Sequence, residues 1–229
     1  MDPLDNMMWH AMSGHQRVIS EGGDHARRYP VDVGPFSAVP DHPTSEDFVA
    51  LGELVGVGNV AILLRGDAIA PDGWEVLGSI TGVQMIGPTS PISASRDERI
   101  LTLGSDDVEE MVSLTSRTKP GPFAPRTHEL GVYLGIRIDG RLVSMAGQRA
   151  QTNDHVEISA VCTDQEFVGR GLGRTLINAQ IQVIAAAGKL PMLHASADNA
   201  RAIALYEYLG FQHRRNFGVV VTRVPEQLL

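Results

Sequence analysis

The sequence is poor in several features that would narrow its class at once. It holds a single cysteine, Cys162, among 229 residues, which excludes an intramolecular disulfide. No cysteines and histidines cluster at the spacing of a zinc site. No apolar run approaches the roughly 20 residues that span a bilayer, and the N-terminal stretch MDPLDNMMWHAM is acidic where a leader peptide would be basic. We therefore expect a cytoplasmic protein that binds no metal and does not enter a membrane.

The net charge is −8, with 43% hydrophobic and 20% charged residues. A negative chain repels phosphate backbones at long range, so nucleic acid is not an expected partner, whereas cationic small molecules or basic peptides are tolerated. The length and composition suit a globular protein of one large domain or two small ones.

The first part of the chain, residues 1–95, is rich in glycine and proline. One helix is predicted from Ser45 to Leu54, with Ser45 as its N-cap, and strands are predicted at 60–64 and 74–86. The stretch PTSPISASRDER, residues 88–99, is rich in turn formers and suggests a domain boundary. We expect an accessory α/β domain here, or a diverged copy of the second domain. Four histidines stand singly and are expected at the surface or in local hydrogen bonds: His10, His15, His25 and His42.

The second part, residues 96–229, has a clearer pattern of predicted helices and strands. Ser105 is predicted to cap a helix, Asp139-Gly140 to turn a hairpin between strands 132–138 and 141–150, and Glu157 to begin a strand that ends at 163. A helix that ends at Gly188, a strand at 190–197, a helix at 199–209 and two closing strands within 211–224 follow.

The stretch EFVGRGLGRTL, residues 166–176, places glycines at 169, 171 and 173 directly before a helix. The first amides of a helix lack intrahelical acceptors and attract anions. Bare backbone would admit a diphosphate, with Arg170 and Arg174 adding positive charge. The alternative is a tight turn without a ligand, which an isolated G-x-G favours.

Two known phosphate motifs do not fit this loop. A Walker A loop needs Gly-Lys-Ser/Thr, whereas Gly173 is followed by Arg174-Thr175. A dinucleotide fingerprint needs G-x-G-x-x-G, but Arg174 and Leu176 occupy the two positions where its last glycine would fall.

A second motif lies downstream, the run Asn-x-x-Ala-x-x-Leu-Tyr-x-x-x-Gly-Phe from Asn199 to Phe211. Together with the strand EISAVCT and the glycine loop, it resembles the Gcn5-related N-acetyltransferase (GNAT) superfamily, in particular its FR47-like branch, over residues 101–224. The family pattern Gln/Arg-x-x-Gly-x-Gly/Ala matches at Gly171 and Gly173, but its first position falls on Val168, which removes a side-chain contact and leaves the backbone cradle. The resemblance implies an α/β (α+β) fold with a mixed, mostly antiparallel central sheet flanked by helices, and a catalytic domain within 96–229.

The resemblance also implies acetyl-CoA, or another acyl-CoA, as co-substrate. Loop amides would hold the pyrophosphate, and backbone groups of the strand end would pair with the pantetheine arm. Asn199 would contact this arm or cap its helix, a role for which Asp198 competes. The implied cofactor-binding residues are Val161, Cys162, Thr163, Val168, Gly169, Arg170, Gly171, Leu172, Gly173, Arg174 and Asn199.

Acyl transfer to an amine needs a base, an oxyanion site and an acid for the leaving thiolate. Tyr206 falls where the family places its general acid, although it also lies on the apolar stripe of its helix and could be a core tyrosine. Glu157 is the candidate general base, with a pKa raised by partial burial; the alternative is a strand-end carboxylate in solvent. His194 is the second candidate base, or else an interior histidine bonded to a backbone carbonyl. The amide near Val161 would polarise the carbonyl.

Cys162 raises the question of a covalent acyl-enzyme. No histidine lies near it in sequence, and a free cysteine in a strand is usually a small buried hydrophobe. We therefore predict direct transfer.

Two other functions compete with an N-acetyltransferase. One is a non-catalytic acyl-CoA-binding module, in which the cradle persists without a base. The other is an interaction protein in which the glycine loop is only a turn. The sequence does not identify the acceptor, a small-molecule or peptide amine, and it leaves a homodimer open because edge strands can pair between chains.

Overall fold

The computed structural model describes residues 2–67, 70–90 and 97–227. Its helices are α1 (Met7–Ser13), α2 (Ser45–Val55), α3 (Val108–Thr118), α4 (Leu172–Ala186) and α5 (Ala200–Tyr208). Its strands are β1 (Glu21–Gly22), β2 (Arg27–Arg28), β3 (Phe36–Ala38), β4 (Val60–Arg65), β5 (Glu75–Ile86), β6 (Ile100–Leu103), β7 (Tyr133–Ile138), β8 (Arg141–Gln151), β9 (His155–Thr163), β10 (Leu190–Ser196) and β11 (Gln212–Arg223). Four short 3₁₀ helices, η1 (Pro3–Asn6), η2 (Ser105–Asp107), η3 (Thr127–Leu130) and η4 (Gln165–Phe167), complete the described elements.

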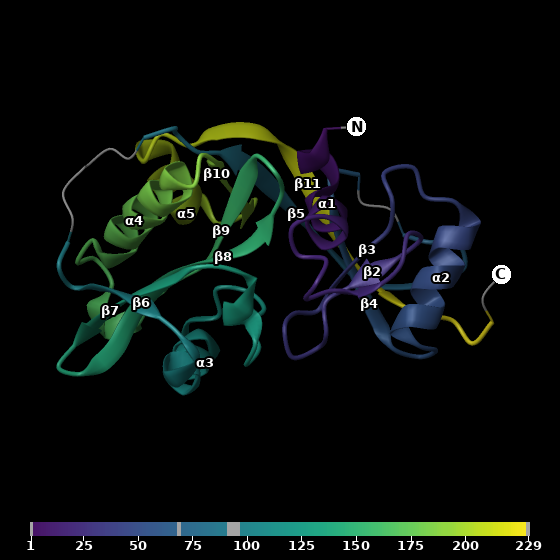
Figure 1. Cartoon of the computed structure of the whole chain (residues 1–229), viewed down its shortest axis with the longest axis horizontal. Helices are drawn as coiled ribbons and strands as arrows, with labels where there is room; N and C mark the ends of the chain where they lie inside the picture. The colour runs from purple at the N-terminus through teal and green to yellow at the C-terminus, as the bar shows by residue number, and fades with distance from the viewer. Residues whose placement is uncertain (1, 68–69, 91–96, 228–229) are drawn as a thin grey trace.

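All these strands belong to one sheet, in the order β1-β2-β3-β4-β11-β5-β10-β9-β8-β7-β6. Only β3–β4 and β9–β10 pair in parallel, so the sheet is mixed and mostly antiparallel, as predicted. The two long strands β5 and β11 run between the two halves of the molecule (Figure 1). The two closing strands predicted within 211–224 are in fact this single strand β11.

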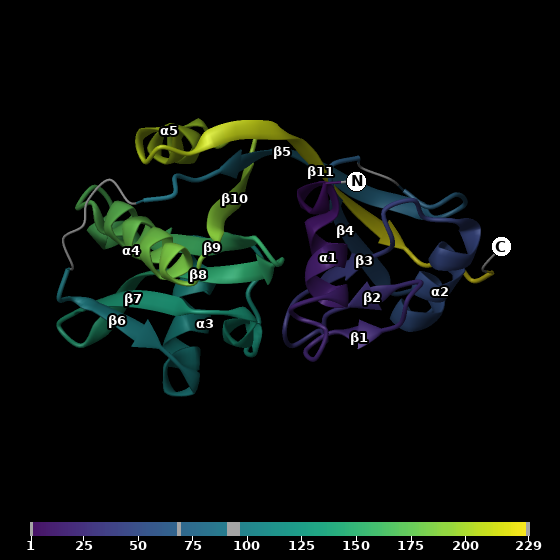
Figure 2. The ribbon, with the colours of Figure 1, turned by 45° about the horizontal axis from the view of Figure 1, so that its top comes forward.

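Strand β5 comes from the first part of the chain but lies between β10 and β11 of the second part. It pairs with β10 from Gly82 to Ile86, and β11 pairs in turn with β4. Figure 2 shows β11 crossing from the side of α5 into the half of the molecule that holds β4. The division into an accessory domain and a catalytic domain near residue 95 stays a prediction, and part of the predicted boundary segment lies outside the described residues.

Helices α3 and α4 cover opposite faces of the second half of the sheet. On β7, Tyr133 packs in a cluster with Met111 of α3, whereas the next residue, Leu134, packs in a cluster with Leu172 and Leu176 of α4. Successive side chains of a strand point to opposite faces, so this single step in sequence separates an α3 face from an α4 face.

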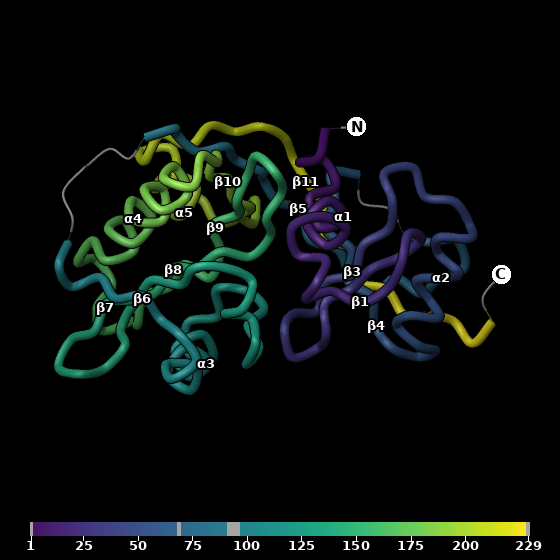
Figure 3. The backbone as a smooth tube through the Cα atoms, viewed as in Figure 1, coloured from purple at the N-terminus to yellow at the C-terminus, as the bar shows by residue number. Residues whose placement is uncertain are grey.

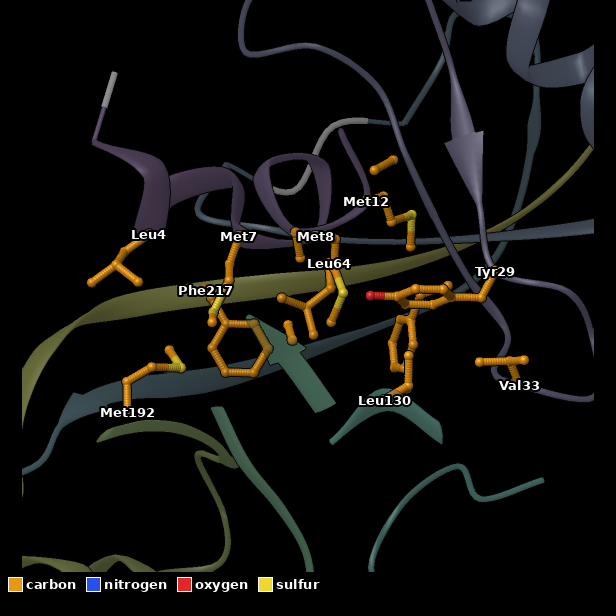
Figure 4. Packing of buried hydrophobic residues seen from close by; sticks show 14 residues of the cluster. Leu4, Met7, Met8, Met12, Tyr29, Val33, Leu64, Leu130, Met192 and Phe217 are labelled. Carbon is orange, nitrogen blue, oxygen red and sulfur yellow. The ribbon is translucent and has the colours of Figure 1, made fainter. Parts of the chain in front are cut away.

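A third cluster joins the two halves. Methionines of α1 (Met7, Met8 and Met12) pack with Leu130, Met192 and Phe217 of the second part, as Figure 4 shows. Each of these methionines is at most 1% exposed. The described part of the chain starts and ends on the side of the first half (Figure 3). The two parts thus share one hydrophobic core.

Local sequence signals predict the positions of the helices, strands and turns more accurately than the residues that cap the helices. The Asp139-Gly140 hairpin is confirmed, with positive φ angles of 51° and 79° at the two turn residues. Ser105 does not cap a long helix: it begins η2, and the Asp107 carboxylate accepts from the amide of Gly104. Helix α2 begins at Ser45, but its N-cap is Thr44, not Ser45 as predicted.

The α2 cap gives a direct test. At this cap Asp47 accepts from the Thr44 amide at 2.7 Å, and the Thr44 hydroxyl donates to the same carboxylate oxygen at 2.9 Å. Thr44→Ala should lower the free energy of unfolding by about 1 kcal/mol in a denaturant titration. Ser45→Ala is the matched control and should cause no loss; an equal loss in both variants would contradict the assignment.

Candidate functional site

The site begins where two neighbouring strands part. Strands β9 and β10 pair in parallel over only three residue pairs, the last of which is Met192 with Glu157. Beyond it β9 stays with β8, while β10 follows β5, as Figure 2 shows. The result is a wedge between β9 and β10 with unpaired backbone along its sides.

A bulge in β9 lies directly after this point. The β8–β9 register slips between Ser159 and Cys162, and Ala160 has a left-handed φ of 52°. An alanine in this conformation is strained, and such strain persists where the surroundings enforce it. Past the bulge the polar backbone of Cys162 faces β8, since Ser144 Oγ donates to its carbonyl at 2.8 Å. Because backbone groups alternate along a strand, those of Val161 and Thr163 point to the open wedge.

The glycine loop closes the wide end of the wedge. Gly169 and Gly171 have left-handed φ angles of 87° and 77°, which glycine adopts without strain. Gly171 is the N-cap of α4, and no side chain caps this helix. Gly173 lies in the first helical turn, where a Cβ would meet only ordinary contacts, at 3.8 Å from Thr163 Oγ1. The first amides of α4 are thus open to an anion, as the sequence suggests.

Every residue predicted to bind the cofactor lines one cleft of about 730 Å³ at this loop, and so does Tyr206. Four further residues line the cleft and were not predicted from the sequence: Phe167, Arg201, Ala202 and Leu205. Phe167 carries the guanidinium of Arg170 at 4.8 Å from its ring centre. The only sequence signal for these residues is their place next to the two motifs.

The loop is tied to the rest of the domain by a buried carboxylate. Asp164 pairs with Arg117 of α3 at 3.0 Å and with Arg141 of β8. Burial would raise the pKa of Asp164, but its hydrogen bonds to the two arginines lower it. The start of the loop is therefore anchored to α3 and β8.

Helix α5 supplies two predicted residues. The side chain of Asn199 caps it by accepting from the Ala202 amide at 3.1 Å, so Asn199 and not Asp198 is the cap. Tyr206 is half-buried at the cleft, with its ring 5.9 Å from that of Phe211. Burial raises its pKa to about 12. No described protein group hydrogen bonds to its hydroxyl, so Tyr206 is a protonated donor at neutral pH that a ligand can approach.

The carboxylate of Glu157 is sealed inside the protein. Arg149 Nε donates to it at 2.9 Å and His194 Nδ1 at 2.7 Å, and the residue is 0% exposed. Burial alone would raise its pKa, but the charge of Arg149 and the contact with His194 outweigh burial and lower it to about 2. The predicted rise in pKa is wrong, because partners 8 and 37 positions away were not foreseeable locally. Glu157 and His194 do not line the cleft.

His194 is held from both sides. Gln84 Nε2, which also donates to the carbonyl of Leu4, lies 2.9 Å from His194 Nε2. Arg214 donates to the side-chain oxygen of Gln84, which fixes the orientation of this amide. His194 is therefore protonated at Nδ1 and accepts at Nε2. His194 is thus an interior histidine, as in the alternative to a catalytic base, but its partners are side chains and not a backbone carbonyl.

Two other features bear on the chemistry. Burial raises the pKa of the Cys162 thiol to about 11, so this cysteine is no nucleophile at neutral pH. The described part of the chain holds no group of three or more histidine, cysteine, aspartate or glutamate side chains arranged to bind a metal. Within the same residues, no helix is both long and apolar enough to cross a membrane.

The buried Glu157 pair predicts a specific response to acid. A folded-state pKa of about 2, below the usual 4.5, stabilises the protein above pH 4.5, and this stabilisation is lost as pH falls toward 2. Glu157→Gln leaves the buried Arg149 charge without its charged partner and should lower the free energy of unfolding by about 3 kcal/mol at pH 7. The gap to wild type should shrink below pH 4.5, as urea titrations at several pH values would measure. Glu166→Gln, at a 70% exposed side chain paired with Arg141, is the control and should have little effect. A pH-independent gap would refute the lowered pKa.

Comparison with known proteins agrees with this geometry. The family model described as FR47-like protein matches residues 133–219. A crystal structure from Novosphingobium aromaticivorans, assigned to the GNAT family of acetyltransferases, is 37% identical, covers 97% of this chain and 99% of its own, and has a TM-score of 0.89. A [ribosomal protein bS18]-alanine N-acetyltransferase of Salmonella typhimurium is 30% identical over 52% of this chain and 85% of its own length.

An uncharacterized protein of Mycobacterium leprae is 28% identical over 80% of this chain, but the match spans only 46% of that longer protein. The likeness to the GNAT structure extends over nearly the whole of both chains. This chain belongs to the GNAT superfamily of acyl-CoA-dependent N-acetyltransferases, in its FR47-like branch.

Proposed function

We propose that this protein transfers the acetyl group of acetyl-CoA directly to an amine, with the cofactor in the wedge between β9 and β10. The observation that carries the proposal is the wedge itself, which leads from the Ala160 bulge to the uncapped N-terminus of α4. One side of it offers strand backbone, which suits the amides of pantetheine. Its wide end offers helix amides, which suit a diphosphate.

The binding roles follow from position. Amides from Val168 to Arg174 would hold the pyrophosphate, and the backbone of Val161 and Thr163 would pair with the pantetheine arm. Val168 replaces the polar side chain of the family pattern. Arg170, held on Phe167, keeps positive charge at the loop.

The chemistry then needs three groups. The amine nitrogen attacks the thioester carbonyl, a C–N bond forms, and the C–S bond breaks while the amide near Val161 stabilises the oxyanion. Tyr206 gives its proton to the leaving thiolate. The nitrogen gives up a proton to a water on the Glu157 side. The ionised Glu157 carboxylate assists this transfer through its charge and not by contact, because it is sealed and paired with Arg149 and His194. His194 does not take the proton in this arrangement, since its Nε2 already accepts from Gln84. The buried Cys162 thiol supports direct transfer.

The acceptor is an amine of a small molecule or a peptide. The relative from Salmonella typhimurium acts on an alanine of a ribosomal protein, which makes peptide amines one class to test. The buried single thiol suits a reducing compartment, and the proposal places the protein in the cytoplasm. The sealed, ion-paired state of Glu157 favours one alternative, a module that binds acyl-CoA without turnover.

Binding is tested first. Gly171→Glu puts a carboxylate and a strained backbone where the pyrophosphate would lie, and calorimetric titration should show acetyl-CoA affinity falling at least about 100-fold. Gly188→Glu is the matched control, because Gly188 has a similar φ of 72° just past the other end of α4. Both variants should stay folded, and the control should bind as wild type does. Equal acetyl-CoA affinity in all three proteins would refute the proposed pyrophosphate site at the glycine loop.

Turnover is tested second, by thiol release from acetyl-CoA with ethanolamine, L-lysine, spermidine and an alanine-leading peptide as acceptors. Tyr206→Phe should lower kcat roughly 100-fold or more while acetyl-CoA affinity stays unchanged. Because the pKa of Tyr206 is about 12, its titration should not limit the wild-type rate below pH 10. Tyr208→Phe, on the same helix and 63% exposed, should be silent. Binding without thiol release in wild type would favour the non-catalytic module.

A further inference from the structure

The cleft at the glycine loop holds positive charge that its own walls do not balance. Arg170, Arg174 and Arg201 all line it, and its described lining residues include no aspartate or glutamate. The chain as a whole carries a net charge of −8. Three cations in one cleft of an acidic chain create a local potential that attracts an anion.

Most arginines of this protein are instead paired with a carboxylate. Arg117 and Arg141 share Asp164, and Arg149 pairs with Glu157. Within residues 2–67, 70–90 and 97–227, the arginines that form no ion pair are Arg17, Arg27, Arg170, Arg174 and Arg201. The last three of these line the same cleft, so their charges point to a ligand.

Two of the three cations stay with the glycine loop. A Cβ added to Gly171 would stand 3.7 Å from Nη2 of Arg174, so this guanidinium lies over the N-cap of α4. The guanidinium of Arg170 lies 4.8 Å from the ring centre of Phe167, in the same loop. Both therefore lie beside the amides proposed for the pyrophosphate and balance its charge.

The third cation, Arg201, comes from a different wall of the cleft. It is the second residue of α5 and is exposed, and the first turn of this helix contains no acidic residue. A cation at this end opposes the helix dipole and lowers helix stability. The cap, Asn199, is neutral, and no described carboxylate pairs with Arg201. The position of Arg201 therefore favours an anionic group of a ligand as its partner.

The proposed co-substrate carries such a group. Besides its diphosphate, CoA has a phosphomonoester on the 3′ oxygen of its ribose, with a charge of about −1.5 to −2 at neutral pH. A planar guanidinium binds such a group through two parallel N–H donors.

We propose that Arg201 binds the 3′-phosphate of CoA, and that the protein thereby selects CoA over its 3′-dephosphorylated form. The inference rests on the proposed function, because it uses the same cleft and the same co-substrate. It makes Arg201 a specificity-determining residue for the proposed reaction.

The test measures calorimetric Kd values for acetyl-CoA and for acetyl-dephospho-CoA, which differ only in the 3′-phosphate. Wild type should bind acetyl-CoA about 10-fold more tightly, as expected for one charge-assisted contact at an exposed arginine. Arg201→Gln should abolish this difference, with weaker binding of acetyl-CoA and unchanged binding of the dephospho form. The wild-type difference should also shrink as salt is raised from about 50 to about 500 mM, because exposed charges are screened.

Two variants serve as controls. Arg174→Gln, at the glycine loop, should weaken the binding of both ligands by a similar factor, because both carry the diphosphate. Arg17→Gln changes an exposed arginine of the first half that lies outside the cleft, and it should alter neither affinity.

Three results would overturn the inference alone. They are equal wild-type affinity for the two ligands, an Arg201→Gln variant that keeps the wild-type difference, and an Arg201→Gln variant that loses affinity for both ligands equally. A folded wild-type protein that binds neither ligand would instead overturn the proposed cofactor site, and this inference with it.

Discussion

The fold is organised around one buried charge. A carboxylate without hydration would cost several kcal/mol, so Glu157 can remain ionised only while Arg149 and His194 both hold it. These partners come from β8 and β10, on either side of β9, and they clamp the three strands together at the last residue pair before β9 and β10 part. From His194 the contacts continue through Gln84 and Arg214 to Asp5 of the first half. The apex of the wedge is therefore rigid for an electrostatic reason.

Beyond the Glu157 ion pair, the two faces of β9 carry different kinds of residues. On the α4 face, glycines and helix amides make a polar, open cradle for an anion. On the α3 face, Tyr133, Ala160 and Cys162 make a dry wall with one unsatisfied hydroxyl. The left-handed Ala160 marks a switch in the alternation of side chains, because Ile158 packs with α4 whereas Ala160, two residues later, packs with the α3 cluster. A single left-handed residue thus changes which side chains of β9 face each side of the sheet.

How far the sequence predicts this protein depends on how local each feature is. The hairpin at Asp139-Gly140, the glycine loop and the helix capped by Asn199 are encoded within a few residues, and the structure has all of them. The residues proposed for the cofactor gather in one cleft because their motifs adjoin the same strand and helix ends. The environment of Glu157 was not predictable, since its pKa depends on partners brought by other strands. Nor was the packing of Tyr133 foreseeable, because nothing near it in sequence shows that Gly147 leaves room for its ring.

The place of β5 has a consequence for how the chain reaches this state. Arg223 of β11 bonds to Glu75 of β5 across 148 positions, so the sheet is completed by one of the most distant pairings in the molecule. Such pairings are slow, because loop closure must precede the contacts that reward it. During synthesis β5 emerges well before β10 and β11, and its uncharged segment VLGSIT has no partner until the C-terminal strand arrives. The nascent chain therefore carries an unpaired apolar strand through most of its translation, and a shielding chaperone would matter more to this half of the fold than to the glycine loop.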